Sequence, residues 1–238
     1  MAGAFFQQYS KLSSPIPLAN LKLWLDGDNH LNTNSRWYDK SVNNYIISQS
    51  IAVNQPTLTS NALNGHSGYS FDGNDYLSGG KILNLNTHGY SLFVVYKRTA
   101  GTNVNIIGKT AFAGVSGEYS LSSLGTSDFS SYCNTTGTQH AIGTQNTSTF
   151  GIANIIMKRI APMDFSNKLY WNNTIKADYT AAIPVNDVSN NYNFNIGATN
   201  QPAYYFTGII CEIIYYDIHL DNTNRDIIYN YLKNKYGL

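Results

Sequence analysis

The chain carries little charge. Only 12% of its 238 residues are Asp, Glu, Lys or Arg, about half the share of an average globular domain. The 15 basic and 14 acidic residues give a formal net charge of +1, and the basic residues are scattered along the chain. Binding to nucleic acid depends on a basic patch that neutralises phosphates. The composition therefore argues against nucleic acid as a partner.

Long apolar segments are also missing. No apolar stretch approaches the about 18 residues that a transmembrane helix needs, and no basic amphipathic helix suggests binding at a membrane surface. Residues 1–10 have neither the charged segment nor the apolar core of a signal peptide. We therefore expect no membrane insertion. We expect either a mature form with an added Met or a protein that never uses the secretory pathway.

Cysteine and catalytic motifs are equally sparse. Cys133 and Cys211 are the two cysteines, and we expect both to be reduced, although a bridge between them stays open. The two glutamates, Glu118 and Glu212, lie far apart in the sequence and have no acidic neighbour two residues away. Sandwich glycosidases need a pair of nearby carboxylates, and the histidines lack metal-ligand spacing. The sequence therefore predicts a protein that is not an enzyme.

What the chain does contain is a series of short apolar and aromatic strands separated by turn residues. No helical pattern lies between them, which is typical of a β-sandwich rather than of alternating strands and helices. The fold class that this predicts is all-β, with two antiparallel sheets. The expected strands are 21–25, 68–77, 90–98, 105–109, 119–124, 150–159, 168–175, 192–198 and 206–216.

Both ends of the chain differ from this pattern. Residues 1–20 contain a Pro-rich segment without periodicity, so we expect an extended arm or linker before a domain that spans 21–238. A helix is predicted near the C-terminus, with Asp221 or Asn222 as its N-cap and Gly237 at its C-terminal end. Its expected apolar face consists of Ile227, Ile228, Tyr231 and Leu232.

Several motifs occur in an order that resembles a known family. They are Leu23-Trp24-Leu25-Asp26-Gly27, Trp37-Tyr38-Asp39-Lys40-Ser41, Gln55-Pro56-Thr57-Leu58, Phe71-Asp72-Gly73-Asn74-Asp75-Tyr76-Leu77, Tyr192-Asn193-Phe194-Asn195-Ile196-Gly197-Ala198 and residues 206–217. This order resembles the concanavalin A-like, laminin-G-like jelly-roll domains over roughly residues 20–238. The resemblance implies two antiparallel sheets, one of them concave, in a family that mostly binds carbohydrate or protein. Some of its members hold calcium at a rim of loops.

Two loops contain enough oxygen ligands to suggest calcium. Asp26 and Asp28 lie in one loop, and Asp72 and Asp75 lie in another. A calcium ion takes six to eight oxygen ligands, so a site requires that the fold bring both loops to one rim. The alternative is that these residues form turns and cap their own backbone.

Ligand-binding aromatics are the other candidates. Trp171 with Asn172 and Asn173, and the pair Tyr204 and Tyr205, combine rings that can stack on a sugar with groups that bind hydroxyls. The alternative for each ring is a place in the core.

These features together predict a non-catalytic recognition module that binds glycans or a cell-surface receptor. We expect it to act in many copies on a virion or on a phage tail or capsid appendage, with residues 1–20 contacting other virion proteins. Two alternatives stay open. One is a purely structural protein that decorates a viral assembly, and the other is a secreted, lectin-like domain of a cell surface. No cofactor other than calcium is suggested.

Overall fold

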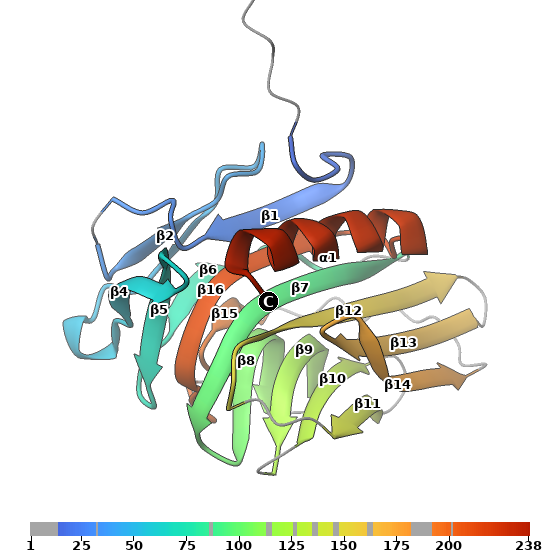
Figure 1. The fold of residues 1–238 in the computed structure, drawn as a ribbon. Helices are drawn as coiled ribbons and strands as arrows, with labels where there is room; N and C mark the ends of the chain where they lie inside the picture. Colours follow the sequence, from blue (N-terminus) through green and yellow to red (C-terminus); the bar gives the residue numbers. More distant parts are fainter. Residues whose placement is uncertain are drawn as a thin grey trace, which may run out of the picture.

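The protein is a sandwich of two antiparallel sheets with one helix packed on its outside (Figure 1). The computed structural model describes residues 14–31, 33–85, 88–112, 116–125, 128–134, 138–144, 148–160, 164–181, 192–200 and 202–238. Each sheet has eight strands. The predicted all-β sandwich with a C-terminal helix is thus confirmed.

The first sheet has the strand order β14-β13-β12-β7-β16-β5-β4, and β1 also pairs with β16. Strand β16 is shared, because its residues 207–210 pair with β5 and its residues 212–216 pair with β1. The strands of the first sheet are β1 (Leu21–Asp26), β4 (Thr57–Leu63), β5 (His66–Asp72), β7 (Gly89–Ala100), β12 (Gly151–Ile160), β13 (Asp164–Trp171), β14 (Thr174–Ala181) and β16 (Thr207–Tyr216).

The second sheet has the order β11-β10-β9-β8-β15-β6-β3-β2, so β2 forms one of its edges. A short 3₁₀ helix, η1 (Ala52–Asn54), follows β3. The strands are β2 (Arg36–Tyr38), β3 (Ile46–Ser48), β6 (Leu77–Gly80), β8 (Asn103–Phe112), β9 (Ser116–Leu124), β10 (Asp128–Asn134), β11 (Thr138–Thr144) and β15 (Phe194–Ile196).

The predicted strand 168–175 is in fact two strands. Asn172 and Asn173 both have positive φ, 46° and 64°, and form the two-residue turn between β13 and β14. Such turns need left-handed backbone at both central positions, which Asn tolerates better than most residues. Strands β10 and β11 are among those that were not predicted, because their Ser-, Asn- and Thr-rich sequences lack the apolar content of a buried strand.

Helix α1 (Asn222–Tyr236) has the predicted ends. The Asp221 side chain accepts a hydrogen bond from the backbone N–H of Asn224, and Gly237 ends the helix with φ of +65°. The predicted apolar face is partly wrong, because Ile227 is exposed. The buried residues are Arg225, Ile228, Leu232 and Tyr236.

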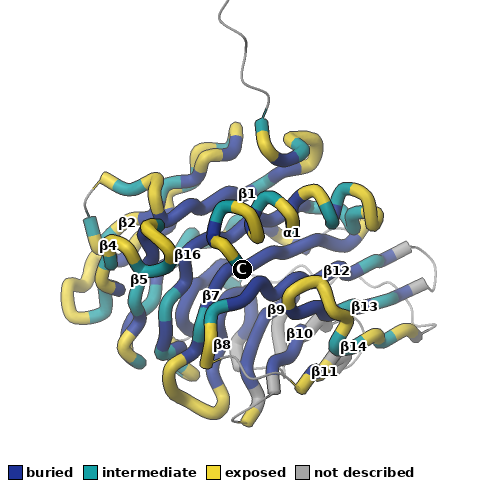
Figure 2. The backbone as a smooth tube through the Cα atoms, in the orientation of Figure 1, coloured by how far each residue is buried: buried dark blue, intermediate teal, exposed yellow. Residues whose placement is uncertain are grey.

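Two hydrophobic cores hold these layers together. The larger core lies between the sheets, and the smaller one lies between α1 and the outer face of the first sheet (Figure 2). Cys211 is a free, buried cysteine in the smaller core, whereas the Cys133 side chain is outside the described residues. Ile16 is also buried in the smaller core, so the packed part of the chain begins before residue 20. Residues 1–13 of the expected arm lie outside the described residues.

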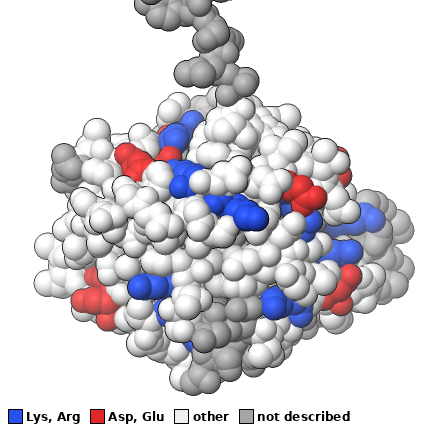
Figure 3. All heavy atoms as spheres, viewed as in Figure 1, with Lys and Arg blue, Asp and Glu red and all other residues white. Residues whose placement is uncertain are grey.

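The surface reflects the low charge of the composition. In the view of Figure 3, charged residues are few on a largely uncharged surface, and several of opposite sign lie side by side. Among the described residues, no helix is both long and apolar enough to cross a membrane.

Candidate functional site

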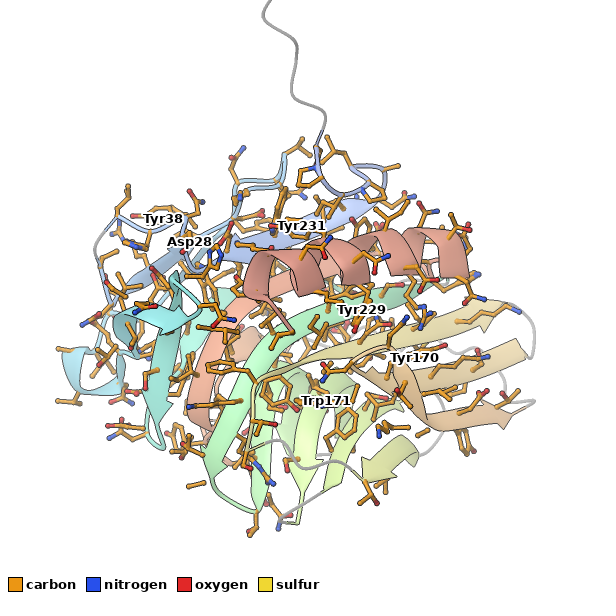
Figure 4. The ribbon with its side chains drawn as sticks, in the orientation of Figure 1. Asp28, Tyr38, Tyr170, Trp171, Tyr229 and Tyr231 are labelled. Atoms are coloured by element: carbon orange, nitrogen blue, oxygen red, sulfur yellow. The ribbon has the colours of Figure 1, made fainter. Side chains whose placement is uncertain are left out.

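Trp171 is not an exposed ligand-binding ring. Only 4% of it is accessible, and its ring packs edge-on against Tyr96 and Phe129, with centroid distances of 5.4 and 5.7 Å. Side chains alternate between the faces of a strand, so Trp171 enters the core between the sheets while Tyr170 faces Arg225 of α1 (Figure 4). The expectation for this ring is therefore corrected, because the hairpin turn begins one residue later.

The other four sequence candidates lie at the surface in two places. Asn172 and Asn173 occupy the β13–β14 turn, where the Asn172 amide oxygen accepts a hydrogen bond from the backbone N–H of Ile152 at 2.9 Å. Tyr204 is exposed and Tyr205 is half-buried, in the loop between β15 and β16. No hollow described below includes these residues.

The two Asp loops do not meet to form a calcium site. Asp26 pairs with Glu212 on one side of β16, whereas Asp72 pairs with Thr207 on its other side. The two partner positions are five residues apart, which corresponds to about 17 Å along a strand. Asp75 accepts a hydrogen bond from the backbone N–H of Asp72 at 2.9 Å and so stabilises its own turn. Within the described parts of the chain, no group of three or more His, Cys, Asp or Glu side chains could hold a metal ion.

Asp26 instead belongs to a charged cluster beneath α1. The Nζ of Lys235 lies 2.6 Å from Asp26 Oδ1 and 2.7 Å from Glu212 Oε2. We define the charged cluster as Asp26, Glu212 and Lys235 with their partners Trp24, Lys40, Tyr231 and Tyr236. Figure 4 shows Tyr231 on α1 beside β1, with Asp28 beyond the end of that strand.

Every carboxylate oxygen in the charged cluster has a partner. Glu212 accepts hydrogen bonds from Trp24 Nε1 at 2.7 Å and from the hydroxyls of Tyr231 and Tyr236 at 3.0 and 2.8 Å. The second oxygen of Asp26 accepts one from Lys40 Nζ at 2.7 Å. The cluster thus joins β1, β16 and α1.

Burial and charge shift the pKa values of the two carboxylates in opposite directions. Burial, and then the neighbouring Asp26, raise the pKa of Glu212 above its ordinary value despite the attraction of Lys235. Burial alone would raise the pKa of Asp26 too, but Lys235 and Lys40 outweigh it and leave that pKa lowered. For Lys235, burial opposes the charge, but the two carboxylates raise its pKa overall.

This pair of carboxylates resembles an acid–base pair in its pKa values but not in its accessibility. The side chain of Glu212 is fully buried and that of Asp26 is 6% exposed, and Lys235 of α1 contacts both. A glycosidase needs its carboxyl groups on either side of the bond that it cleaves. The cluster therefore has a structural role. Spacing along the sequence could not reveal this pair of acids, because Asp26 and Glu212 come from two strands that meet only in the fold.

The best candidate for a binding site is a hollow at the β2–β3 edge of the second sheet. Its volume is about 230 Å³, and Arg36 is the single charged residue in its wall. We call it the polar hollow and define it by its lining residues Ser35, Arg36, Ser48, Gln49, Ser50 and Gln55.

Two side chains of the polar hollow have hydrogen-bond donors without partners. Gln49 is only 5% exposed, and its Oε1 accepts the backbone N–H of Ile51 at 2.9 Å, which fixes the orientation of the amide. Its buried Nε2 has no partner among the described residues. The guanidinium of Arg36, an exposed residue, likewise forms no hydrogen bond or ion pair with any described side chain or backbone group. A buried donor without a partner costs about 1–3 kcal/mol, so Gln49 carries an unmet hydrogen bond at a residue that lines the hollow.

Two other hollows offer less to a ligand. One, of about 240 Å³, lies at the β7–β8 turn, but its Arg98 already donates to the backbone oxygens of Gly101 and Gly125. Another, of about 180 Å³, lies beside the start of α1, where Asp221 is the N-cap of the helix. Of the three, the polar hollow is the one whose described lining includes a buried donor without a partner.

The polar hollow could hardly be predicted from the sequence. Its residues are common polar types on short strands, and only the folded chain brings Ser35 and Arg36 next to residues 48–55. The polar run Ser48-Gln49-Ser50 directly before the apolar Ile51 is the one local feature that could have drawn attention.

Comparisons with known proteins identify the fold but not a family. No protein-family model matches the chain, and no curated protein matches its sequence. Of the resemblance to laminin-G-like domains, the two-sheet antiparallel sandwich is shown.

Similar solved structures are receptor-binding domains of botulinum neurotoxins. That of neurotoxin D has a TM-score of 0.64 at 13% identity and covers 90% of this chain and 53% of its own. A serotype D ligand-binding domain in complex with N-acetylneuraminic acid has a TM-score of 0.63 at 13% identity, with coverages of 89% and 50%. A structure of botulinum neurotoxin type C, whose cell entry depends on interaction with two ganglioside molecules, has a TM-score of 0.62 at 12% identity, with coverages of 90% and 51%. The chain shares their fold.

The similarity to the neurotoxin domains is limited in length and in sequence identity. This chain spans about half the length of each of these structures. At 12–13% identity the likeness shows the sandwich alone. It does not assign the ligands of the neurotoxins to residues of this chain.

Proposed function

We propose that this protein is a non-catalytic recognition module that binds glycans in the polar hollow. The observation that carries the proposal is the buried Nε2 of Gln49, which lacks a partner in the wall of a hollow lined only by polar residues. A ligand oxygen at this place would supply the missing hydrogen bond.

The chemistry of the lining suits a sugar. Sugar hydroxyls both donate and accept hydrogen bonds, and the Ser hydroxyls and Gln amides of the hollow can do the same. Its volume of about 230 Å³ is below the roughly 300–1,000 Å³ of pockets for drug-sized ligands. It therefore suits a single terminal sugar residue. Ile51 and Val53, which are 54% and 76% exposed, offer apolar contact beside it in the chain.

The arrangement of acids supports binding rather than cleavage. None of the six residues that line the polar hollow is acidic, whereas hydrolysis of a glycosidic bond uses two carboxyl groups. The carboxylate pair of the charged cluster is buried and engaged with Lys235. The neurotoxin domains with the same fold support the same class of function, because they are described as binding a receptor, N-acetylneuraminic acid or gangliosides.

The setting in which the module acts is part of the proposal. Shallow sugar sites bind at about millimolar Kd, and linking several copies raises avidity by about 10²–10⁴. We therefore propose that the protein is displayed in several copies at an extracellular surface, as on a virion or phage appendage. Tail or capsid genes beside its gene would support this setting, and genes of a secreted toxin beside it would contradict it.

A variant that fills the polar hollow tests the function. Ser48 is exposed on β3, so Ser48→Trp would occupy the hollow with little effect on the core. Ser60→Trp is the matched control, since Ser60 is exposed on β4 of the other sheet. On a glycan array, we expect the wild type and Ser60→Trp to bind and Ser48→Trp to lose binding.

The tyrosines of the β15–β16 loop provide the competing location. If Tyr204→Ala abolished glycan binding while Ser48→Trp left it intact, the site would lie at that loop. Absence of binding to every glycan by the wild type, tested as multivalent particles, would contradict the function itself.

A further inference from the structure

We propose that the polar hollow selects glycans that end in an acidic sugar, whose carboxylate binds Arg36. This inference rests on the glycan-binding function proposed above and assigns the ligand class. It follows from the charges, donors and size of the hollow.

The polar hollow carries a single positive charge. Arg36 is the sole ionic residue among the six that line it, and no carboxylate of the lining competes for its guanidinium. The salt bridges of the described residues likewise leave Arg36 out. A neutral sugar would leave this cation without a counter-charge, whereas a carboxylate would provide one.

Geometry favours a carboxylate at Arg36. Guanidinium groups bind carboxylates with two parallel hydrogen bonds, which gives both strength and orientation. Strand β2 holds Arg36 opposite Ser48 of β3, so the guanidinium and a serine hydroxyl belong to neighbouring positions of one sheet edge. These groups can bind the acidic substituent together.

The buried amide of Gln49 complements this contact. Its Oε1 is occupied by the backbone N–H of Ile51, so Nε2 remains as a donor. Gln55 has the opposite arrangement, because its Nε2 donates to the backbone oxygen of Gln49 at 2.9 Å and leaves its amide oxygen as an acceptor. The hollow thus offers donors for a carboxylate and an acceptor for a hydroxyl of the same sugar.

The test compares each glycan with a form that lacks only the charge. An array of sialylated and uronate-containing oligosaccharides is printed twice, and in one copy the carboxylates are reduced to primary alcohols. Hydrogen bonds to charged groups are worth enough to change binding by about 10- to 100-fold. We expect the wild type to bind the acidic copy that much more tightly than the reduced copy.

Variants of the lining connect this preference to its residues. Arg36→Ala should remove the preference for the acidic copy, and Arg36→Lys should retain part of it, because Lys keeps the charge without the two parallel donors. Gln49→Glu keeps the acceptor for Ile51 but places a negative charge in the hollow, so it should weaken binding of acidic glycans more than that of reduced ones. Lys233→Ala, an exposed cation of α1, is the control and should behave as wild type.

The outcomes separate the inference from the function on which it rests. Equal binding to both copies, or an acidic preference that survives Arg36→Ala, would overturn the inference and leave glycan binding in place. Binding to neither copy would overturn the proposed function and the inference with it. Melting temperatures of the variants identify any loss of binding that is due to unfolding.

Discussion

The charged cluster and the polar hollow differ in whether their polar groups have hydrogen-bond partners. In the cluster, each oxygen of Asp26 and Glu212 has a hydrogen-bond partner, and α1 covers them. In the hollow, Gln49 Nε2 and the Arg36 guanidinium have none among the described residues. Polar groups that satisfy one another stabilise a fold, whereas unsatisfied ones at a surface hollow indicate a ligand. The difference predicts that cluster variants lose stability and hollow variants lose binding.

The largest loss of stability is expected for Lys235→Met. This change leaves Asp26 and Glu212 as buried carboxylates without their shared cation, and breaking such a buried pair costs about 3–5 kcal/mol. Because two acids are left, we expect about 5 kcal/mol, the upper end of that range, from urea unfolding. Lys233→Met, on the exposed side of the same helix, should change the free energy of unfolding by less than about 0.5 kcal/mol. Equal effects of both variants would contradict a structural role for the cluster.

The effect of Lys235→Met on the free energy of unfolding should depend on pH. Without Lys235, the pKa of Glu212 rises further above its value in the unfolded chain, since burial and Asp26 already raise it. A raised folded-state pKa stabilises the protein at low pH, and this contribution is lost as the pH rises through that value. The difference in unfolding free energy between wild type and Lys235→Met should therefore be smaller at pH 5 than at pH 8. A difference that does not change between these pH values would show that Glu212 stays ionised in the variant.

Trp171→Ala should resemble a cluster variant and not a hollow variant. Removing this buried ring leaves a cavity between the sheets, and such changes cost about 3–5 kcal/mol, so we expect about 4 kcal/mol. The folded fraction should bind glycans like the wild type, which titration at low temperature would measure. Weak glycan binding by fully folded Trp171→Ala protein would show that Trp171 contributes to ligand binding.

The helix cap gives a smaller effect. Asp221→Ala removes the side-chain acceptor for the backbone N–H of Asn224, and loss of such a cap typically costs about 1 kcal/mol. Thermal unfolding should show this loss, while glycan binding stays unchanged. Asp221→Asn, which keeps a capping oxygen, should recover most of it.

Arg36→Ala should have the smallest effect on stability. Arg36 is exposed, and no described residue forms an ion pair with it, so the free energy of unfolding should change by no more than about 0.5 kcal/mol. A loss above about 2 kcal/mol would mean that Arg36 supports the fold, and the contrast between cluster and hollow would fail.

The sequence predicted features that depend on neighbouring residues and missed those that depend on pairing. Apolar runs identified β7 and β16, and local capping signals identified both ends of α1. The contact between Asp26 and Glu212 could not be predicted, because it requires that β1 pair with β16 in one particular register. The hollow depends in the same way on the pairing of Arg36 with Ser48. Trp171 was assigned to the surface because the Asn172-Asn173 pair after it was not recognised as a hairpin turn.

The position of β16 has a consequence for how this domain is made. β16 is synthesised after every other strand, yet it lies inside the first sheet, where β7, β5 and β1 all pair with it. Contacts between residues so distant in sequence form slowly. During translation, the earlier strands of this sheet must wait on the ribosome with their inner edges open, so we expect the nascent domain to depend on chaperones until residue 216 has emerged.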